Sequence, residues 1–157
     1  MLNLNFATLV KAYRHYAVLT PAELSETLGW AGQAGSPGHP RNGALLTSLA
    51  LLAANVPLTG PVKIEAGPLA GRQLQNGANR LADWLVERHG APETIPLDGG
   101  LGAVADQLFA RRGIVAFMQN AGPGGGSIAL LDGHNAAALC VEAQTLHPIE
   151  VRFWAIS

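Results

Sequence analysis

A serine, a histidine and a cysteine are the side chains of this 157-residue sequence that we consider first for catalysis. His134 stands two residues after Asp132, which suggests an acid–imidazole pair, although the intervening Asp-Gly step is above all a hairpin-turn signal. Ser48 falls inside an apolar run that predicts a helix, where a hydroxyl usually bonds back to a backbone carbonyl. Cys140, the only thiol, lies in a second apolar run and is typical of a small buried hydrophobe.

The glycine-rich segment 122–127 (GPGGGS) has the composition of a phosphate-binding loop but not its order. Such a loop needs a lysine and a serine or threonine after its last glycine, at the start of a helix. Here Ser127 leads into Ile-Ala-Leu-Leu, which predicts a strand, so we interpret the glycines as a flexible hairpin turn. The five histidines lack the i, i+4 spacing of metal motifs, and one cysteine cannot build a zinc site. We predict neither a metal nor another cofactor.

The overall composition is apolar and nearly neutral. Hydrophobic residues make up 48% of the chain and charged residues 13%, against about 25% charged residues in a typical soluble domain. This composition excludes intrinsic disorder, which needs low hydrophobicity and high charge. A net charge of −1 gives no electrostatic basis for binding nucleic acid or an anionic membrane.

The sequence also predicts no membrane insertion and no cleavable export signal. Its longest apolar run, residues 44–58, is shorter than the roughly 20 residues that span a bilayer. An export signal places basic residues before its apolar stretch, whereas Lys11 and Arg14 follow the apolar residues here. We therefore expect a protein that is made in the cytoplasm without a cleavable signal peptide.

Hydrophobic periodicity predicts helices in the first half of the chain and strands in the second. The predicted helices cover residues 3–16, 21–28, 43–54 and 76–89, and the predicted strands cover 62–64, 113–118, 127–131, 137–144 and 149–156. The remaining stretches, 31–41 and 91–107, are predicted to be loops, the second with a short helix. This order is typical of an α+β fold, and the length predicts a single domain, 1–157.

The helix predicted at 43–54 is apolar on nearly all sides, which indicates that it is buried. Asn42 is a good N-cap for it. The start of a buried helix concentrates positive potential, which lowers the pKa of a thiol placed there. The first turn, Asn-Gly-Ala-Leu from Asn42 to Leu45, nevertheless contains no nucleophile.

Several short motifs follow one another over nearly the whole chain. They are found at 42–45 (NGAL), 60–64 (GPVKI), 84–85 (WL), 90–92 (GAP), 112–117 (RGIVAF), 126–133 (GSIALLDG) and 153–156 (FWAI). In this order and spacing the sequence resembles the type VI secretion amidase effectors of group four. These effectors are papain-like (NlpC/P60-like) peptidases that cut peptidoglycan stem peptides. The resemblance implies a papain-like fold with N-terminal helices, one buried central helix and a C-terminal antiparallel sheet.

The departures from the family pattern fall on its catalytic residues. The resemblance places the nucleophilic cysteine at Ala44, the general-base histidine at Ser127 and the orienting aspartate at Ala138. It also places a pair of cysteines at Ala136 and Cys140, so that one partner is missing. Covalent catalysis needs a nucleophile and a base, and neither residue type remains at these positions. The resemblance therefore implies a catalytically degenerate member of the family, a pseudo-amidase.

Three functions are open to a degenerate amidase. The first is binding of a protein partner, namely a secretion component, an immunity protein or an effector, which the low surface charge favours because apolar patches are usually partner sites. The second is binding of a peptidoglycan stem peptide in a retained cleft, with Asn42, Ser48, Gly126, Ser127 and His134 as candidate lining residues. The third is a repurposed enzyme that uses Ser48 or His134, with Ser127 and Asp132 as further candidates. The family context further predicts translocation by a type VI system into the periplasm of a target cell.

Overall fold

The structure is a computed structural model, and it describes residues 4–30, 43–120, 122 and 125–156. The chain divides into two compact units, one formed by Ala7–Asn76 and one by Met1–Phe6 together with Gly77–Ser157. Each unit is described by itself below. The single functional domain expected from the length stays a prediction.

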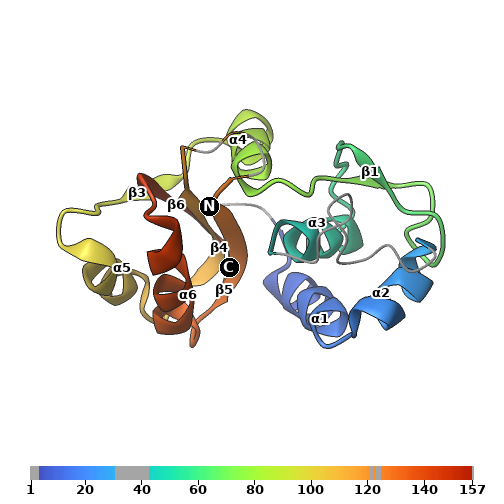
Figure 1. The fold of residues 1–157 in the computed structure, drawn as a ribbon, viewed down its shortest axis with the longest axis horizontal. Coiled ribbons are helices and arrows are strands. Elements are labelled where there is room, and N and C mark those ends of the chain that lie inside the picture. Colours follow the sequence, from blue (N-terminus) through green and yellow to red (C-terminus); the bar gives the residue numbers. More distant parts are fainter. Residues whose placement is uncertain (1–3, 31–42, 121, 123–124, 157) are drawn as a thin grey trace. The chain divides into compact units, whose positions relative to one another are not determined.

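The Ala7–Asn76 unit is mainly helical (Figure 1). Its helices are α1 (Phe6–Ala17, whose first residue belongs to the other unit), α2 (Pro21–Leu28) and α3 (Gly43–Ala53), and its strands β1 (Val62–Lys63) and β2 (Gln73–Leu74) pair antiparallel. The predicted start of α2 is confirmed, because Thr20 and Glu23 form a reciprocal capping box. Sequence reasoning missed β2, whose two residues are too few to show a period.

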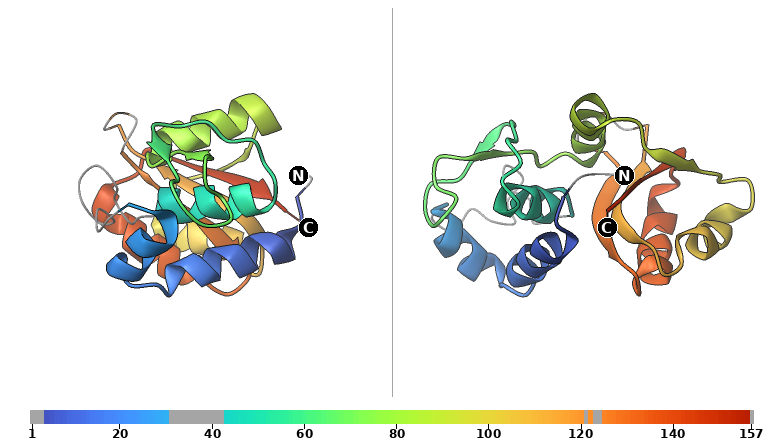
Figure 2. Two further views of the ribbon diagram at one scale, coloured as in Figure 1. Left: turned by 90° about the vertical axis from the view of Figure 1, so that its right-hand side faces the viewer. Right: turned by 180° about the vertical axis from the view of Figure 1, so that it is seen from behind.

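The second unit is built on a four-stranded antiparallel sheet with the strand order β3-β6-β4-β5. Its elements are α4 (Ala78–His89), β3 (Glu93–Ile95), α5 (Gly100–Leu108), β4 (Arg112–Met118), β5 (Ser127–Asp132), α6 (Ala136–Ala143), a 3-10 turn (Gln144–Leu146) and β6 (Glu150–Ala155). Helices α5 and α6 cover one face of the sheet, and α4 packs against β4 and β5 from the other (Figure 1, Figure 2). The predicted α+β class, with its N-terminal helices, buried α3 and C-terminal antiparallel sheet, is confirmed.

Two predicted elements need correction. Residues 137–144, predicted as a strand, belong to α6 and its end. The segment is rich in alanine, which favours a helix, and its buried residues Ala136, Cys140 and Ala143 recur at helical spacing. The stretch 91–107, predicted as a loop with a short helix, also contains the edge strand β3, which pairs with β6.

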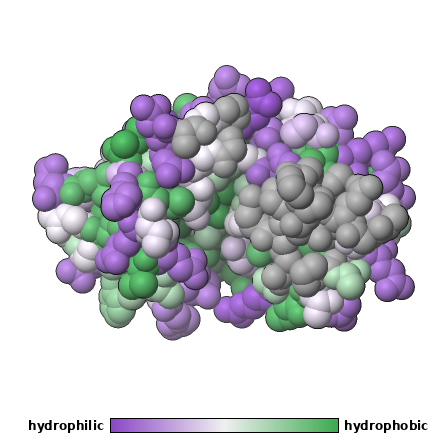
Figure 3. All heavy atoms as spheres, in the orientation of Figure 1, coloured by the Kyte–Doolittle hydropathy of each residue, from purple (hydrophilic) through white to green (hydrophobic). Residues whose placement is uncertain are grey.

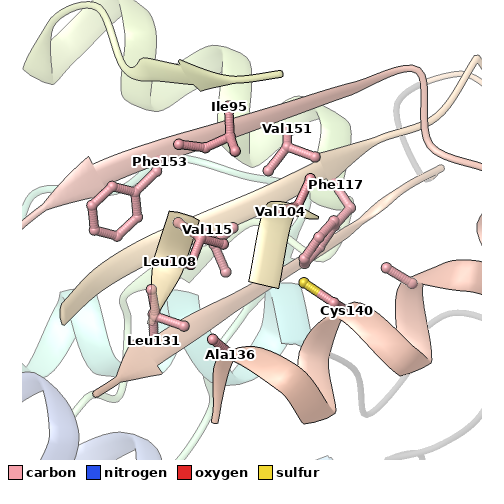
Figure 4. Packing of buried hydrophobic residues seen from close by; sticks show 11 residues of the cluster. Ile95, Val104, Leu108, Val115, Phe117, Leu131, Ala136, Cys140, Val151 and Phe153 are labelled. Atoms are coloured by element: carbon pink, nitrogen blue, oxygen red, sulfur yellow. The ribbon is translucent and has the colours of Figure 1, made fainter. Parts of the chain in front are cut away.

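The core of the second unit lies between the sheet and the helices α5 and α6 (Figure 4). Its members are Ile95, Val104, Leu108, Val115, Phe117, Leu131, Ala136, Cys140, Ala143, Val151 and Phe153. Strand β4 supplies the centre of this core, since it lies between β6 and β5. Because helices cover both faces of the sheet, six of its seven residues are buried. Among the described residues no helix is both long enough and apolar enough to cross a bilayer.

Candidate functional site

The first predicted site position, Ala44, lies in the first turn of the buried helix α3. Its side chain is 1% exposed, and a methyl group can neither attack a carbonyl nor carry a proton. Asn42, the predicted cap of this helix and a candidate cleft residue, lies outside the described residues. The helix therefore supplies a buried, apolar start without a reactive group at this position.

Ser48 is held in a structural role one turn further along α3. Its side chain is fully buried, and its hydroxyl donates to the carbonyl oxygen of Gln75 at 2.8 Å. The same hydroxyl oxygen accepts the backbone N–H of Gln75 at 3.3 Å. This pair of bonds ties α3 to the backbone that follows β2, so the hydroxyl is engaged on both its donor and its acceptor side.

The neighbouring hydroxyl, on Thr47, shows the opposite condition. Thr47 is 1% exposed, and its Oγ1 has no hydrogen-bond partner in the described structure. A buried hydroxyl without a partner destabilises a fold by about 1–3 kcal/mol. No base lies within hydrogen-bond distance of the Thr47 hydroxyl among the described residues, so nothing there activates it as a nucleophile.

Ser127, the second predicted position, begins β5 in the other unit. It is paired with Phe117 of β4, and residues directly opposite one another on antiparallel strands point to the same face. Phe117 belongs to the core under α5 and α6, so Ser127 points toward that face too. Its side chain is half-buried. A hydroxyl stands where the family pattern has an imidazole.

A polar network that sequence reasoning missed surrounds the entry to β5. The Asn79 side-chain amide donates to the carbonyl oxygens of Gln119 and Gly122 at 2.6 and 2.8 Å, and its oxygen accepts the N–H of Gln119 at 3.3 Å. The Gln119 side chain accepts the N–H of Gly126 at 3.1 Å and donates to the Leu146 carbonyl at 3.0 Å. The turn predicted to be flexible is therefore tethered at Gly122 and Gly126, while residues 121, 123 and 124 lie outside the described structure.

Within this network only glycine fits at position 126. Its φ is +81°, and a Cβ at this position would lie 2.5 Å from Oδ1 of Asn79 and 2.7 Å from the carbonyl oxygen of Phe117. Neither Asn79 nor Gln119 carried a sequence signal, because a single amide residue on a helix or after a strand is ordinarily a solvated one.

The predicted pair of Asp132 and His134 forms a turn rather than a catalytic contact. The Asp132 carboxylate accepts the backbone N–H of His134 at 2.8 Å, and the Asn135 side chain accepts the N–H of Asp132 and donates to the Leu130 carbonyl. Such Asx contacts build tight turns. The contact between the two residues thus uses the His134 backbone, and the imidazole is exposed.

Ala138, the third predicted position, lies on the exposed side of α6, opposite the residues that face the sheet. Cys140 is 3% exposed and packs into the core of the unit (Figure 4). Burial raises the pKa of its thiol, which keeps it protonated and unreactive. The prediction that Cys140 is a small buried hydrophobe is confirmed.

The described side chains form no cluster with the chemistry of a metal centre. No group of three or more histidine, cysteine, aspartate or glutamate residues in residues 4–30, 43–120, 122 and 125–156 is placed to hold a metal ion. Ala44 and Ser48 belong to one unit, and Gly126, Ser127, His134 and Ala138 to the other. The cleft predicted between these two sets stays a prediction.

The comparison with solved structures gives matches, and these matches agree on the fold. No protein-family model matches the sequence, and no curated protein matches it. A chain in the structure of the effector–immunity system Tae4/Tai4 from Salmonella typhimurium matches with a TM-score of 0.71 at 14% identity, over 99% of both chains. The type VI effector–immunity complex Tae4–Tai4 from Enterobacter cloacae gives a TM-score of 0.68 at 12% identity, over 99% of this chain and 100% of that one.

A third similar structure is that of the effector Tae4 from Salmonella typhimurium in complex with the immunity Tai4 from Enterobacter cloacae. It matches with a TM-score of 0.69 at 15% identity, over 99% of this chain and 100% of the other. Likeness at such low identity concerns the fold alone. It confirms the predicted papain-like α+β fold over essentially the whole chain.

Proposed function

We propose that this chain is a catalytically inactive relative of a type VI secretion peptidoglycan amidase effector and that it acts by binding a protein partner. The observation that carries the proposal is the occupation of the three family positions by Ala44, Ser127 and Ala138 on a complete scaffold. A cysteine amidase forms its covalent intermediate through a thiolate that a histidine deprotonates. Alanine and serine at these positions perform neither step.

The loss concerns chemistry and not architecture. In enzymes with a catalytic triad, removal of one member costs several orders of magnitude in rate, and removal of further members adds little more. A sequence that has lost all three groups while it keeps the fold serves another purpose. Binding is such a purpose, because it needs the shape of the scaffold and not its reactive atoms.

Replacement catalysts are poorly supported by the described geometry. Ser48 is fully buried and bonded to Gln75 on both sides of its hydroxyl. His134 is exposed, and its contact with Asp132 runs through the backbone. A recruited base needs hydrogen-bond reach to the proton that it takes and a group that orients it. These observations argue against the repurposed enzyme.

The type of partner follows from the context of similar structures. The similar chains come from effector–immunity complexes of type VI systems, in which one protein binds another. We accordingly assign this chain to a secretion or toxin setting, with a secretion component, an immunity protein or an effector as its partner. Synthesis in the bacterial cytoplasm and delivery into a target-cell periplasm belong to the same proposal.

A second candidate function is the binding of a peptidoglycan stem peptide. It is favoured by the network of Asn79 and Gln119, which holds Gly126 in place at the start of β5. A backbone segment held in place in this way is suited to recognising a peptide. This function needs neither a nucleophile nor a base.

One titration separates these functions. Purified muropeptide with an intact stem peptide is added to the isotope-labelled chain, and NMR spectra of the protein and mass spectra of the muropeptide are recorded on the same sample. Protein binding as the function predicts no cleavage and no chemical-shift change. Shifts around Ser127 without cleavage support the stem-peptide module, and a Gly126→Ala variant, whose Cβ collides with Asn79, should abolish them. Cleavage that His134→Ala or Ser48→Ala removes would overturn the proposal.

A further inference from the structure

Helix α6 carries apolar side chains on the side turned away from the sheet. Its inner face is formed by Ala136, Cys140 and Ala143. On the outer side Ala137 and Ala138 are exposed, and Val141 is 63% exposed. These outer positions are three and four residues apart, so they lie next to one another on the helix surface. A surface helix normally carries mostly polar residues there, and this one carries a single charged residue, Glu142.

Phe109 extends the apolar surface from the end of α5. It follows the last residue of that helix and is 77% exposed. Helices α5 and α6 pack against one another, and the Ala110 carbonyl oxygen and the Arg112 side chain both lie near Gly133, in the loop that leads into α6. Half-buried apolar residues of both helices, Leu101, Ala105 and Leu139, pack against the core of the unit.

We call the exposed residues Phe109, Ala137, Ala138 and Val141 the α5–α6 face. Hydrophobic residues are prominent in this part of the unit at the lower left of Figure 3. Exposed apolar patches on a protein surface mark interaction sites more often than chance. An exposed aromatic residue such as Phe109 is the usual anchor of such a site.

The charged residues on the two segments that carry the α5–α6 face are all negative. Asp98, Asp106 and Glu142 are exposed, and none of them takes part in an ion pair in the described part of the chain. The segments 98–110 and 136–146 contain no lysine or arginine, although the whole chain has 10 basic residues for 11 acidic ones. The basic residues that follow directly are Arg111, which is paired with Glu93, and the exposed Arg112. The apolar residues are therefore accompanied by three carboxylates that form no ion pair among the described residues, against one nearby arginine, Arg112, that forms none either.

The exposed apolar residues and the carboxylates favour one kind of partner at the α5–α6 face. A second copy of the chain would set carboxylate against carboxylate, and an anionic membrane would repel the same groups. We propose that the α5–α6 face is the docking surface for a protein that presents apolar side chains within a rim of lysine and arginine. This inference rests on the proposed protein-binding function and adds to it the location of the interface and the charge of the partner.

The test uses two synthetic helical peptides as probes. Both carry the same leucine-rich face, which is flanked by lysines in one peptide and by glutamates in the other. The lysine peptide should bind the isotope-labelled chain with chemical-shift changes at the α5–α6 face. The glutamate peptide should bind roughly tenfold more weakly or not at all. Equal binding of the two peptides, no binding of either, or shifts confined to other surfaces would overturn the inference.

Variants separate the apolar and the charged contributions. Phe109→Ser with Val141→Ser should abolish binding of the lysine peptide, whereas Val18→Ser, at an apolar residue that is 79% exposed in the other unit, should leave it unchanged. Asp106→Lys with Glu142→Lys should reverse the preference in favour of the glutamate peptide. Far-ultraviolet circular dichroism of each variant establishes that it is folded. If Val18→Ser also lost binding, the peptide would not be bound specifically at the α5–α6 face.

Two companion measurements keep this inference apart from the proposed function. Light scattering of the free chain should give a monomer mass, because a dimer that Val141→Ser dissolves would make the face a self-association surface. Vesicles with anionic lipid should not retain the chain. Failure of the peptide test leaves the absence of muropeptide cleavage untouched, so the location of the interface and the loss of catalysis are judged separately.

Discussion

Helices α3 and α6 have almost the same composition and opposite environments. α3 has no charged residue among its 11 residues, and α6 has one, Glu142, among its eight. Eight residues of α3 are buried, against three of α6. One apolar helix is thus enclosed and the other is covered on one face only. Composition predicts that an apolar helix is buried. Only the packing shows how much of its surface is buried within its own chain.

The difference separates stability from function. The residues of α3 that could carry chemistry are absent, as at Ala44, or used structurally, as at Ser48. The outward residues of α6 contribute little to the fold and remain available to another molecule. Under the proposed function, the enclosed helix maintains the shape of the scaffold, and the half-covered helix carries the proposed surface for binding.

The largest difference between α3 and α6 is expected when one large side chain is truncated in each helix. Leu49→Ala in α3 removes a fully buried side chain and should lower the free energy of unfolding by about 2–5 kcal/mol. Val141→Ala in α6 removes a side chain that is 63% exposed and should change it by no more than roughly 0.5 kcal/mol. Urea unfolding measures both. Similar losses in the two variants would mean that α6 is packed as tightly as α3.

The two hydroxyls of α3 sharpen the comparison within the enclosed helix. Ser48→Ala leaves the Gln75 backbone groups without this partner in a buried place, so it should destabilise the fold by about 1–3 kcal/mol. Thr47→Val has nearly the same shape and removes a hydroxyl without a partner, so it should stabilise by about 1 kcal/mol. Thermal unfolding of the two variants gives the signs directly. A loss of stability in Thr47→Val would show that its hydroxyl is satisfied in solution.

A second cysteine on the inner face of α6 tests whether that helix keeps regular geometry. In a helix the Cβ atoms of residues i and i+4 are about 5–6 Å apart, whereas a disulfide needs about 3.5–4.5 Å. The variant Ala136→Cys should therefore keep both the introduced side chain and Cys140 as free thiols unless a turn of α6 unwinds. Thiol titration after mild oxidation under native conditions makes the measurement. Rapid cross-linking with retained helical signal would show that α6 is not a regular helix.

The smallest effect is expected from a surface ion pair of the same unit. Glu93 accepts two hydrogen bonds from Arg111, and these bonds hold the pKa of the carboxyl below its ordinary value of 4.5. A lowered folded-state pKa contributes stability that is present above 4.5 and is lost as the pH falls through the folded value. Both side chains are partly exposed, so the contribution should be about 0–1 kcal/mol. Unfolding of wild type and Glu93→Gln should converge in acid and differ slightly at neutral pH.

The sequence predicts most of the fold because its longer elements carry strong local signals. The capping box at Thr20, the apolar circumference of α3 and the β-branched run of β4 are each sufficient alone. Sequence reasoning fails where tertiary contacts decide. The run from Ala137 to Gln144 has no polar residue to reveal a period of 2 or 3.6 until its end, so its pattern predicts a strand where the chain forms an apolar helix on a sheet.

The sequence predicts only part of the candidate site. The proposal that Ala44, Ser127 and Ala138 replace reactive groups follows from the resemblance of the sequence to the amidase effectors. The tethering of the glycine-rich turn does not, because Asn79 lies 40 residues before Gln119 and neither residue has a local signature. The exposed apolar face of α6 is also beyond the reach of sequence reasoning, since its recognition requires the helix to be placed on the sheet first.

The most direct measurement of the central claim is the rate at which the wild-type chain cleaves peptidoglycan stem peptides. Mass spectrometry of purified muropeptides, incubated at high protein concentration, should show no product above a blank without protein. The scaffold without a nucleophile at position 44 and without a base at position 127 predicts this result. Cleavage that increases with time and with the concentration of the wild-type chain would contradict it.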